Sequence, residues 1–157
     1  MGRATVAAGD RSGFNACVEL IGESAQIPAS CPDCASSGIV ILGHGVIDGH
    51  WSWSRSFRCD ACRTAVEEDH AGPGPPDVRA ALRASNGVWL ICAAGAYDRV
   101  TAMRVLRRLV PLSMEEARTR ADELTDVGIE GTRTEVTWLA GELERGGVAL
   151  GEPVRRA

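Results

Sequence analysis

The sequence predicts an α+β protein in two parts: a β-ribbon bounded by cysteines, then an α/β domain of strand–helix–helix–helix–strand order. Three observations predict this. Two Cys-x-x-Cys pairs enclose a strand-like segment, a Gly- and Pro-rich run interrupts the chain, and helix-capping signals with helical apolar periodicity follow it. We expect an unassigned N-terminal extension (1–27), the ribbon (28–70), a linker (71–76) and the second domain (77–157).

The composition indicates a folding chain, with 45% apolar and 24% charged residues among 157. Its longest nearly apolar stretch, Val88–Ala96, is half of what a membrane crossing needs. The N-terminal residues have no sustained apolar core, so we expect no secretory signal and a cytoplasmic protein. Residues 1–77 contain five Arg and ten acidic residues, a net charge of −5, and residues 78–157 contain twelve Arg and eleven acidic residues, a net charge of +1. This balance argues against a protein that binds nucleic acid over its whole surface.

The ribbon is predicted from alternation and turn residues. Ile39–Leu42 is rich in β-branched residues, and Trp51, Trp53 and Phe57 share one parity, as a half-buried strand requires. Glycines between these segments supply the turns. The N-terminal extension suggests only one element, a strand or helix around Ala16–Gly22.

Two Cys-x-x-Cys pairs, separated by 24 residues, flank this ribbon. Tetrahedral zinc takes four soft ligands, and each short pair can aim two sulfurs inward. The alternatives are two disulfides, which need an oxidising compartment, or a redox pair, which usually starts a helix. Four thiolates leave no open position, so we expect Zn²⁺ to be structural. The predicted ligands are Cys31, Cys34, Cys59 and Cys62. Zinc knuckles usually have glycine after the second cysteine, where this chain has Ala35 and Arg63.

The remaining cysteines and histidines give weaker signals. His44 and His50 flank the ribbon tip and either join a second metal site, for which a third ligand is missing, or lie on the surface. Cys92 stands in an apolar run and is expected in the core, and Cys17 is expected to be a free thiol or a small core residue.

The second half alternates strand and helix signals. A short helix from Pro76 to about Ala84 precedes a buried strand at Val88–Ala93 and a helix at Arg99–Val110. The latter places Ala102, Met103, Leu106, Leu109 and Val110 on one face and arginines on the other.

Two further helices have capping boxes, Ser113 with Glu116 and Thr132 with Glu135. Between these two helices, Asp126–Gly131 is predicted as a loop, and Val148–Leu150 as the closing strand.

Residues 87–151 resemble the C-terminal domain of the bacterial ribosomal large-subunit stalk protein, and a protease adaptor has a similar fold. The pieces that carry the resemblance are Asp98-Arg99-Val100, Leu112-x-x-x-Glu116-Ala117, Glu130-Gly131 and Leu143-Glu144-x-x-Gly147. In that family, the first helix and the start of the second dock translational GTPases with basic residues around an exposed apolar one. The resemblance implies a docking surface of Arg99, Val100, Arg104, Arg107 and Arg118. The alternative is that these arginines only solvate a helix face. The family's Gly-Leu-Gly turn is Pro111-Leu112-Ser113 here, and its dimerising helices are replaced by the ribbon.

These residues favour a non-enzymatic zinc-binding adaptor whose basic helix docks an acidic protein partner, either a translation factor or a toxin. No nucleophile–base or phosphate-loop motif occurs, so we expect no enzyme and no small-molecule substrate. A nucleic-acid-binding or transcription-regulatory ribbon is the alternative, because Trp51, Trp53, Arg55 and Arg58 place aromatics among cations. The charge of residues 1–77 opposes it.

Overall fold

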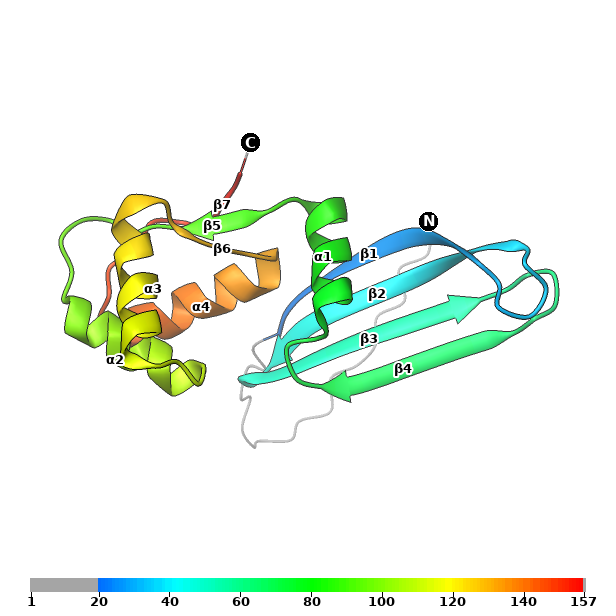
Figure 1. Cartoon of the computed structure of the whole chain (residues 1–157), viewed down its shortest axis with the longest axis horizontal. Helices are drawn as coiled ribbons and strands as arrows, with labels where there is room; N and C mark the ends of the chain where they lie inside the picture. The colour runs from blue at the N-terminus through cyan, green and yellow to red at the C-terminus, as the bar shows by residue number, and fades with distance from the viewer. Residues whose placement is uncertain (1–19, 157) are drawn as a thin grey trace, which may run out of the picture.

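The computed structural model describes residues 20–156 and contains two antiparallel sheets and four helices (Figure 1). The elements are β1 (Leu20–Ser30), β2 (Ser37–Ile47), β3 (His50–Arg58), β4 (Ala65–Ala71), α1 (Pro76–Asn86), β5 (Trp89–Ile91), α2 (Arg99–Leu109), α3 (Met114–Asp126), β6 (Ile129–Gly131), α4 (Arg133–Arg145) and β7 (Val154–Arg155).

The first sheet is a meander of order β1-β2-β3-β4, with every neighbouring pair antiparallel. The register sets His44 of β2 opposite Glu23 of β1 and Trp53 of β3. The predicted ribbon strands are therefore present, and the sheet begins at Leu20 rather than at residue 28. Of the element expected around Ala16–Gly22, residues 20–22 lie in β1 and the rest lies outside the described residues.

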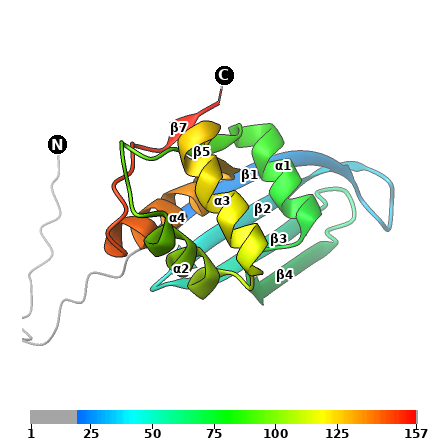
Figure 2. The same ribbon diagram turned by 60° about the vertical axis from the view of Figure 1, so that its left-hand side comes forward.

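Helix α1 packs on one face of this first sheet. Val78 and Leu82 of α1 are fully buried against Ala25 and Leu42. The Gly-Pro segment that precedes α1 turns back toward the sheet, and a side chain at Gly74 would contact Trp53. Figure 2 shows α1 lying across the strands, so the helix after the predicted linker adds to the core of the ribbon.

The second sheet has the order β6-β5-β7 and packs with α2, α3 and α4. Its central strand, β5, contributes the fully buried Ile91, around which Leu106, Leu124, Leu143 and Val148 form the core. Both predicted capping boxes are present, at Ser113 and at Thr132.

Two details of this half differ from the expected order. The predicted loop Asp126–Gly131 contains β6, and the predicted closing strand Val148–Leu150 is reduced to a single bridge between Leu150 and Ala93. Val148 instead fills the core, and the closing strand β7 lies later, at Val154–Arg155. These strands are two or three residues long, too short for a period-two pattern to be recognised.

Helix α4 contacts both sheets. Its residue Thr134 is buried and donates its backbone N–H to Glu23 Oε1 of β1 at 2.9 Å. Glu23 Oε2 also accepts from Asn86 Nδ2 at the end of α1, at 3.0 Å. One carboxylate of the first sheet thus holds the start of α4 and the end of α1, and it connects the two halves of the chain.

Candidate metal centre

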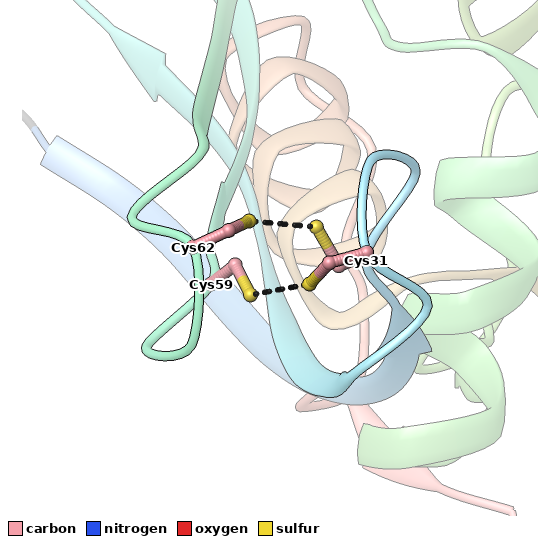
Figure 3. Close-up of side chains that lie close together, drawn as sticks. Cys31, Cys59 and Cys62 are labelled. Carbon is pink, nitrogen blue, oxygen red and sulfur yellow. Dashed lines mark hydrogen bonds between the residues drawn. The ribbon is translucent and has the colours of Figure 1, made fainter.

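The four predicted metal ligands lie at one end of the first sheet. Cys31 and Cys34 occupy the turn from β1 to β2, and Cys59 and Cys62 occupy the turn from β3 to β4. Because the sheet is a meander, these two turns emerge at the same end. Figure 3 shows the sulfur atoms of the two turns facing one another across this end.

The two turns have the same backbone hydrogen bonds. In the first, the Cys31 N–H donates to the Ser36 carbonyl at 2.8 Å, and the Ala35 N–H donates to the Cys31 carbonyl at 3.0 Å. In the second, the Cys59 N–H donates to the Thr64 carbonyl at 2.8 Å, and the Arg63 N–H donates to the Cys59 carbonyl at 2.9 Å. Each turn therefore places both of its sulfurs on the inner side.

The distances between the sulfurs fit one metal ion. The Sγ atoms of Cys31 and Cys62 are 3.5 Å apart, those of Cys34 and Cys59 are 3.6 Å apart, and all four lie within 4.8 Å of one another. A tetrahedral ion with metal–sulfur bonds of about 2.3 Å separates its ligands by about 3.8 Å. The four thiols are free, and these two separations are far longer than a disulfide bond of about 2.05 Å.

The site is buried on one side only. Cys31 and Cys59 are buried against Phe57, whereas Cys34 and Cys62 are exposed. Gly38 allows this contact, because a Cβ there would lie 2.4 Å from the Phe57 ring. The aromatic ring thus excludes water from the inner side of the thiol cluster.

Polar neighbours spread the pKa values of the thiols. A hydrogen bond with the Thr64 hydroxyl, 3.1 Å away, is the main reason why the pKa of Cys62 falls to about 6. Hydrogen bonds with Ser36 lower the pKa of Cys34. For Cys59, a hydrogen bond from the Cys62 backbone lowers the pKa, but burial and the neighbouring thiols outweigh it and raise the pKa to about 11. Metal binding replaces the remaining protons, so affinity for the ion falls as the pH falls.

Thr64 also links the two turns. Its hydroxyl oxygen lies 2.6 Å from Asp33 Oδ2, and Asp33 belongs to the first turn whereas Thr64 ends the second. Such outer contacts orient metal ligands. Sequence reasoning missed both residues, since threonine and aspartate in these turns form no ligand pattern of their own.

The four cysteines form the one group of three or more possible metal ligands within residues 20–156. His44 and His50 therefore do not converge with a third ligand in this part of the chain. The arrangement can hold one ion with four thiolates and leaves no open position for water, which is the chemistry of a structural site.

His44 is instead a buried residue of the first sheet. It stacks on Trp51, which meets Trp138 of α4 edge-on, and neither ring nitrogen makes a well-formed hydrogen bond to any described residue. Burial lowers the pKa of His44, although the carboxylates of Glu135 and Glu23 act in the opposite direction. Its glycine-rich sequence context gave no sign of this burial.

The aromatic residues considered for stacking on bases pack against other side chains of the molecule. Trp53 stacks on His70, and Arg55 lies over the Trp53 ring while pairing with Asp77 and Glu68. Both Trp51 and Trp53 are half-buried on the face that the helices cover. Among this predicted set, Arg58 is exposed. The sheet therefore presents no platform of exposed tryptophans on this face.

The residues of the expected docking surface lie on α2 and on the adjacent turn of α3. Val100, Arg104 and Arg107 follow one another at helical spacing, and Val100 is 59% exposed. Arg104 and Arg118 are exposed, with no carboxylate within ion-pair distance among the residues that the structure describes. These two cations are therefore available for an external contact.

The other two arginines of this set have partners. Arg99 pairs with Asp122 of α3, which fixes it at the edge of the surface. Arg107 donates to the Leu112 carbonyl at 3.2 Å and contacts Met114 Sδ at 2.9 Å. Met114 is itself 58% exposed. The surface thus has two apolar side chains among its arginines.

Of the two leftover cysteines, Cys92 is half-buried and lies beside Gly128, where a Cβ would approach its sulfur to 2.9 Å. Cys17 lies outside the described residues.

The fold and site define an α+β protein with a four-cysteine cluster able to hold a metal ion. Comparison with protein-family models, with curated proteins and with solved structures finds no match. None of the helices in residues 20–156 has the length and apolar character that a membrane span requires.

Proposed function

We propose that this protein is a non-catalytic adaptor, stabilised by a structural zinc ion, that binds an acidic protein surface through α2 and the start of α3. The observation that carries the proposal is the stripe of Val100, Arg104 and Arg107 beside Arg118. It is a basic surface with an exposed apolar centre, on a molecule whose metal site is closed to substrates.

Zinc is the ion that the site favours. Four thiolates in tetrahedral arrangement match a soft, borderline ion, and zinc needs no redox partner. The bound ion would fix the two turns of the first sheet. Residues 20–71 alone have a small core, so the ion contributes folding free energy that they lack.

The charge of α2 supports an acidic partner. The helix contains four arginines and no acidic residue. Arg108 is neutralised by Glu142 of α4, whereas Arg104 points to solvent. An arginine fork binds carboxylates in two-point contacts, and Val100 and Met114 supply apolar area next to it. Translation factors and toxins are the two partner classes that the resemblance and the adaptor hypothesis suggest.

The test is quantitative affinity capture from extracts of the native cell, read by mass spectrometry. The full chain is compared with the double variant Arg104→Glu and Arg107→Glu. We expect the variant to capture at least about tenfold less of the main protein that the wild type captures, because its new glutamates would face an acidic surface. The wild-type capture should also fall with added salt, since exposed charges are screened.

A matched control separates the surface from net charge. Arg133→Glu with Arg155→Glu makes the same change in net charge at exposed positions on α4 and β7. The control should capture the partner as the wild type does, and both variants should keep the wild-type circular dichroism. Equal capture by all three proteins would reject the proposed surface.

A further inference from the structure

Strand β2 is apolar on both of its faces. Its even-numbered residues Val40, Leu42 and Val46 point toward the helices and are buried or half-buried. Its odd-numbered residues Ile39, Ile41 and Ile47 point the other way and are 45–52% exposed. An antiparallel sheet that meets water on one face has polar residues on that face, and a strand apolar on both faces is typical of burial on both. The second face of β2 thus has the composition of a buried surface.

This second face, here called the open face, is the side of the first sheet opposite α1. Helices α1 and α4 pack on the other side, where Val78 and Leu82 are buried and Trp51 meets Trp138 (Figure 2). The open face extends over all four strands, from β1 to β4.

The open face is hollowed near the turn between β2 and β3. Gly43 and Gly45 of β2 lie beside Ser52 and Ser54 of β3, and these small residues form the floor of a hollow of about 450 Å³. Ile47 lies at one margin of the hollow, and Ile41 lies beyond it on the same strand. Ile39 and Ile41 line a second hollow of about 450 Å³ on the same face. The exposed isoleucines therefore form an apolar ridge beside hollows that have room for apolar side chains.

Because the ridge and the hollow lie on the same face, the open face of one copy can be complementary in shape to the open face of a second copy. In a two-fold arrangement, the ridge of one copy enters the hollow of the other and the reverse contact forms by symmetry. The small side chains of the floor allow two sheets to approach to the usual distance of about 10 Å. The open face carries charges of both signs, Arg58 on β3 and Glu67 and Asp69 on β4. Such a mixed surface does not favour a partner with a strong charge of one sign.

The size of the face is sufficient for a dimer. Strands of about nine residues rise about 3.4 Å per residue and lie about 4.8 Å apart, so four of them cover about 600 Å². Two copies would remove about 1,200 Å² from water, the lower bound of stable interfaces.

We propose that the open face is a homodimer interface, in which the first sheets of two copies pack face to face. This arrangement buries the ridge of Ile39 and Ile41, and it leaves the metal site and the arginines of α2 outside the interface.

Sedimentation equilibrium of the metal-loaded full chain tests this proposal. We expect a dimer with a dissociation constant in the micromolar range, as an interface of this size permits. Ile41→Asp places a charge in the interface and should raise the constant at least about tenfold. Ser54→Arg fills the hollow from the opposite strand and should do the same. Val127→Asp, at an exposed valine after α3, is the matched control and should leave the constant unchanged.

A chain that stays monomeric at several hundred micromolar overturns the proposal. A dimer whose dissociation constant changes less than twofold in either folded variant, or changes as much in Val127→Asp, overturns it as well. Circular dichroism and metal content identify the folded variants, and Ser54→Arg serves if Ile41→Asp does not fold.

Discussion

The residue after the second cysteine of each turn has a left-handed backbone. Ala35 has a φ of 58° and Arg63 a φ of 63°. This conformation places the Cβ of an L-residue close to its own carbonyl, at a cost of about 1–2 kcal/mol. The turn geometry needs it, because it turns the chain back so that the carbonyl of the next residue, Ser36 or Thr64, accepts from the N–H of the first cysteine. Glycine, usual in zinc knuckles, would adopt this backbone without the steric cost.

We therefore predict that Ala35→Gly and Arg63→Gly each raise the free energy of unfolding of the metal-loaded protein by about 1 kcal/mol. Ala61→Gly is the matched control, since Ala61 lies in the same turn without a positive φ, and it should not stabilise. Urea denaturation measures all three. If Ala35→Gly and Arg63→Gly behave like Ala61→Gly, the left-handed conformation is wrong.

A second prediction concerns His44. Its pKa is lowered in the folded protein, and an unfolded histidine titrates near 6.5. As the pH falls, His44 is therefore protonated in the unfolded state before it is protonated in the folded state. The free energy of unfolding should decrease below about pH 6.5 and level off once the pH is below the pKa of His44 in the folded state. Glu23, Glu135 and Arg79 are the charged groups that act on the ring.

Urea denaturation between pH 5 and pH 8 measures this dependence. His44→Phe should flatten the slope between about pH 5 and pH 6.5, whereas His50→Phe, at an exposed residue, should keep it. Parallel curves for the wild type and His44→Phe would contradict the buried, neutral state of this ring.

At the scale of elements, the two capping boxes differ in burial. Thr132 at the start of α4 is fully buried, and Ser113 at the start of α3 is exposed. Glu135 completes the α4 box and also accepts from Arg79 of α1. Burial alone would raise the pKa of Glu135, but the Thr132 N–H and Arg79 outweigh it and hold the pKa below its usual range. The start of α4 is thus a buried polar junction between α1, α4 and Glu23 of β1.

We predict that Thr132→Ala costs about 2 kcal/mol of unfolding free energy, because it leaves a buried N–H without an acceptor. Ser113→Ala should cost about half as much, since water can replace the lost acceptor there. Thermal or urea denaturation gives both values. Equal losses would mean that the α4 junction is open to water.

Local signals account for the elements that sequence reasoning found. The spacing of the four cysteines, the two capping boxes and the run of apolar residues around Ile91 each depend on neighbours along the chain. They predicted the thiol cluster, α3, α4 and β5 to within a few residues.

The features that sequence reasoning missed depend on residues that are far apart in the sequence. Strand β6 becomes a strand only because Ile129 is buried against β5. The place of α1 on the first sheet, and the contact of Glu23 with Thr134, join residues far apart in the sequence. The burial of His44 likewise follows from Trp51 and Trp138, which no local pattern connects.

At the scale of the whole molecule, the metal site supports more than the ribbon. The four cysteines close both turns of the first sheet, and α1 and α4 pack on that sheet. If a bound ion were removed, the thiolates would repel one another or take up protons, and the small core around Phe57 would not compensate for the lost metal–sulfur bonds. The arginines of α2 lie on the other half, so the proposed docking surface and the cysteine cluster are separate surfaces.

The central claim is that four thiolates hold one structural zinc ion. X-ray absorption at the zinc edge, together with metal analysis of the purified full chain, tests it most directly. We predict one zinc per chain with four sulfur ligands at about 2.3 Å and no oxygen or nitrogen ligand. A spectrum that requires a light-atom ligand, or cysteines found in disulfides without bound metal, would contradict the claim.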